Sequence, residues 1–273
     1  MKNLANKIAV ITGAGSGIGR ELALQLSSKG AVVALTDFNA KTLQKTYQDI
    51  LDKGGRASQY VFDVANREAV YGFAEEVLDE YGHVDIVINN AGVALGRLTV
   101  NEVSYKDFEW IVGINMWGPI YGTKAFLPTL LKRPEASIVN ISSLFGIIGM
   151  GTQAPYCTTK FALRGFNESL RMELIDTNVV ISSVHPGGIR TNIARNSRPV
   201  SESEKAKMVK RFDKLAKTTA ESAAAQIIRG IQAKNTRILV GNDAKIMDVI
   251  ARIFPRLYTR FISSRVKKME KRQ

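Results

Sequence analysis

The sequence predicts an α/β protein: a doubly wound, seven-stranded parallel sheet with helices on both faces. Seven short apolar runs, rich in β-branched residues, alternate along the chain with stretches of helical length. This alternation implies right-handed crossovers between parallel strands, and continuously apolar strands suit a sheet that is covered on both sides. The expected strands span residues 7–11, 31–36, 57–62, 84–89, 136–141, 179–184 and 237–240.

The first element is a strand followed by a glycine-rich turn and a helix. The apolar run 7–11 leads into residues 12–19, whose glycines are spaced Gly-x-x-x-Gly-x-Gly, and a helical stretch over 20–29 follows. Glycines let the backbone approach a pyrophosphate, and the unpaired N–H groups at a helix start attract its negative charge. The turn is therefore predicted to hold the phosphates of a dinucleotide, with contacts from Gly13, Ser16, Gly17, Ile18 and Gly19.

The second strand, residues 31–36, ends beside a carboxylate. Asp37 lies 24 residues after Gly13, close to the spacing of a residue that binds the ribose hydroxyls of an adenosine. A carboxylate here also repels a 2′-phosphate, and neither Ser16 nor Phe38 supplies a cation to bind one. The sequence therefore favours NAD(H), while two nearby cations, Arg20 and Lys41, leave NADP(H) open.

The later strands are also followed by residues suited to binding. Asp37, Asp63, Asn90, Ser143 and Pro186 all lie at or just past predicted strand ends. The carboxyl ends of parallel strands share one edge of a sheet, and ligands of such sheets bind outside that edge. We therefore expect these residues to line one site.

The helical stretch after the fifth strand carries the residues best suited to proton transfer. Tyr156 and Lys160 are four residues apart, which places both side chains on one helix face. An ammonium beside a phenol favours the phenolate and should lower the pKa of Tyr156. Such a pair can move a proton near neutral pH, which an ordinary tyrosine with a pKa of about 10 does poorly.

Taken in order, these motifs resemble the short-chain dehydrogenase/reductase family, from about residue 5 to about residue 241. The resemblance implies a Rossmann-like fold. One departure is the run Cys157-Thr158-Thr159, where an Ala-Ser pair usually precedes the lysine. The family's catalytic positions fall on Asn115, Ser143, Tyr156 and Lys160. Its cofactor contacts fall on the glycine-rich turn, Asp37 and Phe38, and on Asp63, Val64, Asn90, Ala91, Gly92, Tyr156, Lys160, Pro186, Gly187, Ile189 and Thr191.

The resemblance also implies a mechanism. Tyr156 as phenolate removes the alcohol proton while a hydride leaves the carbon for the nicotinamide, and reduction reverses these steps. Lys160 would lower the pKa of Tyr156 and hold the nicotinamide ribose. Ser143 would stabilise the charge that develops on the substrate oxygen, and Asn115 would anchor a relay water through its helix backbone.

The charge is high and unevenly distributed. The net charge is +13, and residues 241–273 carry nine Lys/Arg against three Asp/Glu. Apolar residues recur there at helical spacing, interrupted by Pro255. We expect a dinucleotide-binding and catalytic domain over residues 1–241, including a substrate lid at about 192–217, and a basic amphipathic extension over 242–273. This extension either docks on an anionic membrane surface or packs on the cleft or a neighbouring subunit.

The apolar lid and tail favour a hydrophobic secondary alcohol or ketone as substrate. An NADPH-dependent 3-oxoacyl-carrier-protein or carbonyl reductase is the alternative, because an acidic carrier would suit the basic rim. A non-catalytic dinucleotide-binding protein is a different class of answer, and the intact catalytic set argues against it. The cations also lack the interleaved aromatic residues of a single-strand nucleic-acid platform, so no nucleic-acid partner is expected.

Location and assembly are predicted less directly. A single cysteine, no secretory-type start and no apolar stretch of about 20 residues favour the cytoplasm, with peripheral contact at the inner membrane surface left open. His83 and His185 are scattered and do not suggest a metal site. Family members commonly pair through the helices around residues 105–131 and 156–175, which implies a homo-oligomer, either a dimer or a tetramer.

Overall fold

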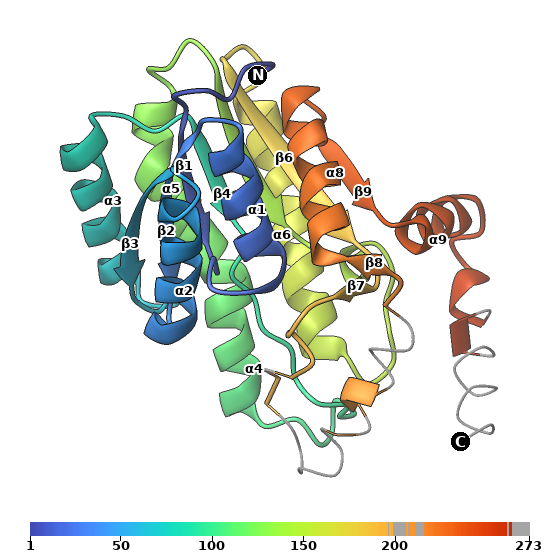
Figure 1. Cartoon of the computed structure of the whole chain (residues 1–273). Coiled ribbons are helices and arrows are strands. Elements are labelled where there is room, and N and C mark those ends of the chain that lie inside the picture. Colours follow the sequence, from blue (N-terminus) through green and yellow to red (C-terminus); the bar gives the residue numbers. More distant parts are fainter. Residues whose placement is uncertain (196, 199–205, 207, 211–215, 261, 264–273) are drawn as a thin grey trace.

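Seven parallel strands form one sheet in the order β3-β2-β1-β4-β5-β6-β9 (Figure 1). The computed structural model describes residues 1–195, 197–198, 206, 208–210, 216–260 and 262–263. The order reverses direction between β1 and β4, which makes the sheet doubly wound and Rossmann-like. The strands are β1 (Ile8–Thr12), β2 (Val32–Asp37), β3 (Arg56–Val61), β4 (Ile86–Asn89), β5 (Ala136–Ile141), β6 (Val179–Pro186) and β9 (Arg237–Val240).

Helices cover both faces of this sheet, so the predicted fold class is confirmed. One face carries α1 (Gly17–Ser28), α2 (Ala40–Leu51) and α8 (Ala220–Gln232), and the other carries α3 (Arg67–Tyr81), α5 (Gly118–Leu130) and α6 (Ala154–Glu173). The remaining elements are α4 (Tyr105–Val112), the π-helical turn η1 (Gly113–Trp117), the 3-10 turn η2 (Leu144–Gly146), β7 (Ile189–Arg190), β8 (Thr218–Thr219) and α9 (Asn242–Ile253).

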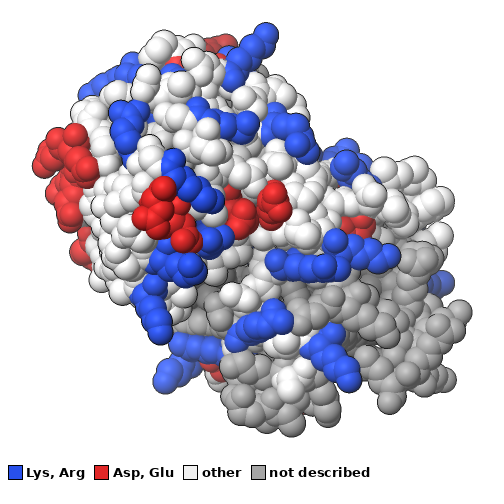
Figure 2. Space-filling model, viewed as in Figure 1, with Lys and Arg blue, Asp and Glu red and all other residues white. Residues whose placement is uncertain are grey.

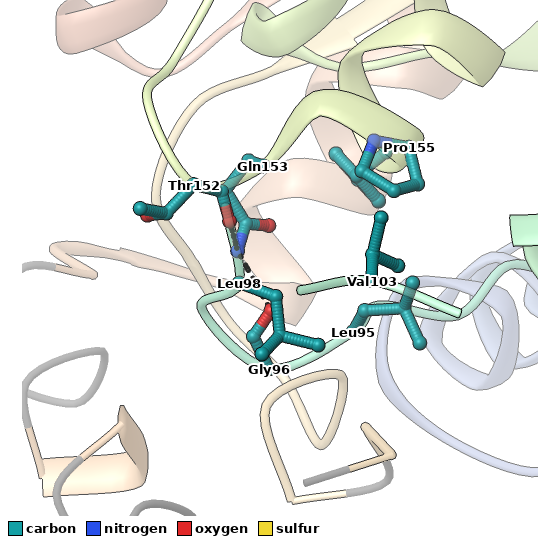
Figure 3. Close-up of a pocket in the computed structure, with 8 residues that line it drawn as sticks. Leu95, Gly96, Leu98, Val103, Thr152, Gln153 and Pro155 are labelled. Carbon is teal, nitrogen blue, oxygen red and sulfur yellow. Dashed lines mark hydrogen bonds between the residues drawn. The ribbon is translucent and has the colours of Figure 1, made fainter. Parts of the chain in front are cut away.

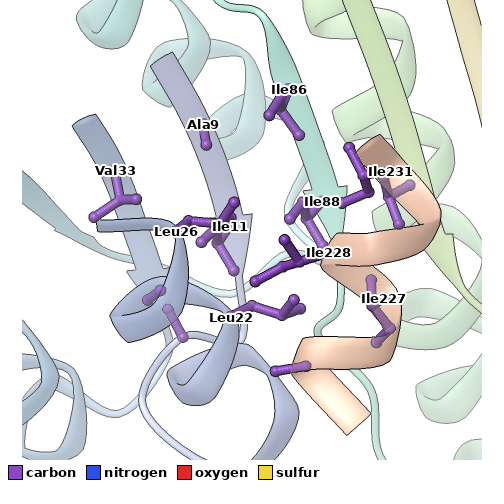
Figure 4. Close-up of a cluster of buried hydrophobic side chains, with 14 of the residues drawn as sticks. Ala9, Ile11, Leu22, Leu26, Val33, Ile86, Ile88, Ile227, Ile228 and Ile231 are labelled. Atoms are coloured by element: carbon purple, nitrogen blue, oxygen red, sulfur yellow. The ribbon is translucent and has the colours of Figure 1, made fainter. Parts of the chain in front are cut away.

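The two helical layers follow from the apolar character of both strand faces. Successive side chains of a strand point to opposite sides of the sheet. In β1, Ala9 and Ile11 therefore join the core beneath α1 and α8, whereas Ile8 and Val10 join the core beneath α3 and α5. Figure 4 shows the first of these cores, in which the isoleucines of α8 meet those of β1 and β4.

All seven expected strands are present, with boundaries that differ by at most two residues. The largest differences are at the start of β4, which begins at Ile86 rather than at 84, and at the carboxyl end of β6, which runs to Pro186 rather than to 184. A short additional pair, β7 with β8, is parallel and joins Ile189 to Thr218. Two-residue strands carry no periodicity, so this pair has no signal in the sequence.

The C-terminal extension begins as helix α9, directly after the last strand. Arg237 of β9 binds the buried carboxylate of Asp248 in α9 through two hydrogen bonds of 2.9 and 2.5 Å. In Figure 1 the helix stands at the edge of the molecule, beyond β9. Among the residues that the structure describes, no helix combines the length and apolarity needed to cross a bilayer.

The predicted lid is described only in part. Its apolar residues Met208 and Val209 are half-buried. Two further apolar residues of this segment, Phe212 and Leu215, lie outside the described residues.

Candidate active site

The glycine-rich turn forms a tight cradle between β1 and α1. Gly17, at the start of α1, has φ of +55°, which a residue with a side chain rarely adopts. A Cβ on Gly19 would overlap the Gly13 carbonyl oxygen and the Asn90 amide. Ser16, the residue before the helix, makes no side-chain capping bond. The close backbone approach and the helix start therefore fit the pyrophosphate of a dinucleotide.

Asp37 lies beside this turn, at the carboxyl end of β2. Its Oδ2 accepts a hydrogen bond of 2.9 Å from the Gly15 N–H, and its Oδ1 accepts one of 3.0 Å from the Asn39 N–H. The carboxylate is thus oriented by the turn and remains partly exposed. Phe38 is 69% exposed, and its ring is available to a ligand or to solvent.

Two further predicted residues lie at the end of β3. The exposed Asp63 accepts a bond of 2.9 Å from the Ala65 N–H, and Val64 is buried against Gly118. The Asp63 side chain therefore stabilises the turn that follows it.

The segment after β4 is tied directly to the glycine-rich turn. The Asn90 amide donates to the carbonyl oxygens of Thr12 (2.9 Å) and Gly13 (3.2 Å). The Thr12 hydroxyl accepts from the backbone N–H groups of Asn90 and Ala91, both at 3.0 Å. A Cβ on Gly92 would lie 3.5 Å from the Lys160 ammonium, so this segment leads from the cradle to the predicted catalytic residues. Sequence reasoning missed the role of Thr12, a strand-end residue next to the glycines.

Asn115 lies in the π-helical turn η1 and is fully buried. Its Oδ1 accepts from the Val93 N–H at 2.8 Å, and its Nδ2 donates to the Val93 carbonyl oxygen at 2.9 Å. The side chain thus braces the backbone that follows Gly92. The water-anchoring role expected of Asn115 would therefore fall to its main chain, in a π-helical turn of the kind often found at functional sites.

Tyr156 and Lys160 lie on one face of α6, as predicted from their spacing. The Lys160 Nζ is 5.7 Å from the Tyr156 ring centroid and donates a 3.0 Å bond to the Ile141 carbonyl oxygen. Burial lowers the pKa of Lys160 to about 8. Burial also raises the pKa of Tyr156 to about 12, although a hydrogen bond with the Ser143 side chain acts to lower it.

The expected lowering of the Tyr156 pKa is therefore not produced by the protein groups alone. Removing the ring from water disfavours the phenolate more than the neighbouring groups stabilise it. The same desolvation lowers the pKa of Lys160 and so disfavours its charged form, whereas the sequence analysis assumed a permanently charged ammonium.

Ser143 is placed by a buried histidine. A backbone carbonyl oxygen can only accept a hydrogen bond, so His185 Nδ1 carries the proton and donates to the Ser143 carbonyl at 3.0 Å. Its Nε2 then accepts from the Ser183 hydroxyl at 3.0 Å. Burial lowers the pKa of His185 to about 4, which keeps the ring neutral. Sequence reasoning considered His185 only as a metal ligand and missed this contact, which joins two strand ends.

The segment after β6 returns to the glycine-rich turn. Thr191 approaches Gly17, where a Cβ would lie 3.2 Å from its side chain. Upstream, the Gly187 N–H donates to the Val240 carbonyl at 2.9 Å, and the Gly188 N–H donates to Asp243 Oδ2 at 2.6 Å. Asp243 belongs to α9, so the C-terminal extension helps to hold this loop. No sequence motif pointed to that residue.

A small, mostly apolar pocket adjoins Tyr156 (Figure 3). Its walls come from the segment after β4 and from the start of α6. Thr152 and Gln153 contribute polar side chains to its lining, and the Gln153 amide donates to the Gly96 carbonyl at 3.5 Å. The lining residues are Leu95, Gly96, Leu98, Val103, Thr152, Gln153, Pro155 and Tyr156.

Comparison with known proteins identifies the family. The model of the short chain dehydrogenase family matches residues 7–202. The chain belongs to this family. It is an oxidoreductase of the dehydrogenase/reductase type.

Several relatives within the family match this chain over most of their length. It is 42% identical to SadH of Mycobacterium tuberculosis over 271 residues, covering 98% of each chain. It is also similar to a solved short-chain dehydrogenase/reductase from Burkholderia phymatum in complex with NAD, with a TM-score of 0.87, 28% identity, and coverage of 94% of this chain and 97% of that one. A metagenomic short-chain oxidoreductase in complex with NADP gives a TM-score of 0.72 at 27% identity, with coverage of 87% and 98%.

Proposed function

We propose that this enzyme transfers a hydride between NAD(H) and a hydrophobic secondary alcohol or ketone. The observation that carries the proposal is the position of Tyr156, which lines a mostly apolar pocket and whose helix also carries Lys160. A pocket lined by leucine, valine and proline side chains favours a substrate with apolar groups beside its reacting oxygen.

The chain supplies an acid/base and three supporting residues. Tyr156 would exchange a proton with the substrate oxygen, Ser143 would donate a hydrogen bond to that oxygen, and Asn115 would support a water through its main chain. Lys160 would hold the ribose near the nicotinamide. When bound, the nicotinamide ring supplies the hydride acceptor or donor and, in its oxidised form, a positive charge that favours the phenolate.

Replacing Tyr156 by Phe tests this assignment. The ring and its packing are kept, and the proton is lost. We expect turnover of hydrophobic secondary alcohols with NAD⁺ to fall by at least about a hundredfold. NADH binding, measured by fluorescence titration, should stay nearly intact. Near-normal turnover in Tyr156→Phe would remove the tyrosine from the mechanism.

We propose NAD(H) as the preferred cofactor because Asp37 borders the cradle and presents a carboxylate where a 2′-phosphate would lie. The contacts assigned to the cofactor are those of the glycine-rich turn and of the strand ends described above. Titration with NADH and NADPH, repeated for Asp37→Ala, tests the preference. We expect the unmodified enzyme to bind NADH more tightly than NADPH, and Asp37→Ala to bind the two cofactors with similar affinity. A preference of the unmodified enzyme for NADPH would instead favour a 3-oxoacyl-carrier-protein or carbonyl reductase.

Charge and the common assembly of family members support a proposal for location and oligomeric state. We propose a cytoplasmic homodimer or homotetramer that acts in lipid or secondary-alcohol metabolism and can contact the inner membrane surface peripherally. The net charge of +13 supports contact with an anionic surface.

A further inference from the structure

The C-terminal extension presents an apolar stripe away from the body of the protein. Ala244 and Asp248 face inward and are buried, which fixes the rotation of α9. Ile246, Val249 and Ile253 then lie on the outer side at helical spacing, and Phe254 and Leu257 continue the stripe past the helix end. Each of these five side chains is more than half exposed. Isolated exposed apolar residues are ordinary, but a contiguous stripe marks an interaction surface.

Positive charge borders this stripe, and the one exposed acid of α9, Asp243, accepts from the Gly188 N–H at the start of the helix. Lys245, Arg252 and Arg256 are all exposed. Between residues 244 and 260 the single acidic residue is Asp248, which is 5% exposed and paired with both Arg237 and Arg252. In Figure 2 acidic side chains lie on the side of α3 and across the centre of the face, whereas the α9 end shows mostly uncharged surface, with Lys, Arg and a small acidic area at its border.

We propose that α9 and residues 254–257 form a docking surface for an anionic lipid bilayer. An apolar helix face flanked by cations lies in the interface of such a membrane, with its apolar side chains below the headgroups. The charge pattern argues against a second copy of the chain as the occupant. A two-fold contact through this face would bring the cations at its border toward those of the partner, with no exposed acid between residues 244 and 260 to offset them.

Docking would place the active-site loops near the membrane. Asp243, in the first turn of α9, binds the Gly188 N–H in the loop that reaches Thr191. Farther along the extension, the Tyr258 hydroxyl accepts from the Gly149 N–H at 3.5 Å, in the segment between η2 and α6. The inference that substrate then arrives from the lipid phase rests on the proposed function, whereas the docking itself does not.

Vesicle sedimentation of the full-length protein tests the docking. The vesicles are phosphatidylcholine alone or phosphatidylcholine mixed with phosphatidylglycerol, at fixed moderate salt. We expect binding to the anionic vesicles. It should fall about 25-fold in Lys245→Gln/Arg256→Gln, since each basic residue contributes about fivefold, and at least about tenfold in Val249→Ser/Ile253→Ser.

A matched pair elsewhere serves as the control. Met172 and Ile175, at 78% and 76% exposed, are equally apolar surface residues on and just after α6. Met172→Ser/Ile175→Ser should bind vesicles as the unmodified protein does. All variants should keep their NADH affinity and their turnover of a water-soluble alcohol, so a failure of docking is separable from a failure of the proposed reaction.

Three results would overturn the proposal. The first is unchanged vesicle binding in both α9 variants, which would assign any binding to other basic segments. The second is absence of binding to anionic vesicles. The third is a concentration-dependent dimer, measured by analytical ultracentrifugation, that is lost in Val249→Ser/Ile253→Ser, because the stripe would then be a contact between copies of the chain.

Discussion

Lowering the pH should destabilise the protein through one buried histidine. His185 is 1% exposed and holds the Ser143 carbonyl and the Ser183 hydroxyl, an arrangement that needs the neutral ring. Its pKa falls from the ordinary 6.5 to about 4 on folding. Below pH 6.5 His185 therefore binds a proton in the unfolded chain but not in the folded chain. The free energy of unfolding decreases as the pH falls from 6.5 toward 4.

The magnitude follows from the size of the shift. A difference of about 2.5 pKa units corresponds to about 3 kcal/mol of unfolding free energy once the pH is below both values, and to about 2 kcal/mol at pH 5. Because the burial of His185 itself causes its pKa shift, this loss of unfolding free energy should disappear when His185 is replaced. Acidic groups with lowered pKa values add to the decline, but they do so equally in every variant compared.

Urea unfolding between pH 7 and pH 5 measures this term. The unmodified enzyme should lose about 2 kcal/mol more over this range than His185→Asn, which cannot take up the proton. The chain has one other histidine, His83, whose side chain is 34% exposed. His83→Asn should keep the full decline. A His185→Asn variant with the same pH dependence as the unmodified enzyme would refute the reasoning, and His185→Gln would guard against a local packing effect of the first substitution.

Two further substitutions test the cofactor cradle. Gly19→Ala should weaken NADH binding at least about tenfold in a fluorescence titration, since its Cβ would overlap the Gly13 carbonyl, and unchanged affinity would show that the turn has room to shift. Asp243→Ala removes the acceptor for the Gly188 N–H and should weaken NADH binding about fivefold, the value of one modest hydrogen bond at an exposed site. Its exposed neighbour provides the control: Asn242→Ala should bind NADH normally, and equal effects of the two would assign the loss to α9 as a whole.

The sheet and the cradle are features that local sequence patterns specify. Strands that are apolar on both faces must be covered on both faces, and alternating apolar runs and helical stretches predict a parallel sheet with right-handed crossovers. The glycines before α1 and the four-residue spacing of Tyr156 and Lys160 are equally local. Their consequences, a tight turn and a shared helix face, were therefore predictable.

The electrostatic state of the site was decided by the tertiary structure. A phenol beside an ammonium predicts a lowered pKa only if both groups stay in contact with water or with each other. In the fold, Lys160 turns its ammonium to the Ile141 carbonyl and both groups are desolvated, so the pKa of Tyr156 rises. Burial depends on how the whole molecule packs, so it cannot be predicted from the five-residue pattern that contains Tyr156 and Lys160.

The sequence by itself determined the α/β class, the seven strands and the residues that meet at the carboxyl edge of the sheet, because these depend on periodicity and on strand order. Only the tertiary structure revealed that His185 holds Ser143 and that Asp243 holds the loop after β6. Those bonds join residues 42 and 55 positions apart, between segments whose approach is set by the packing of the whole sheet.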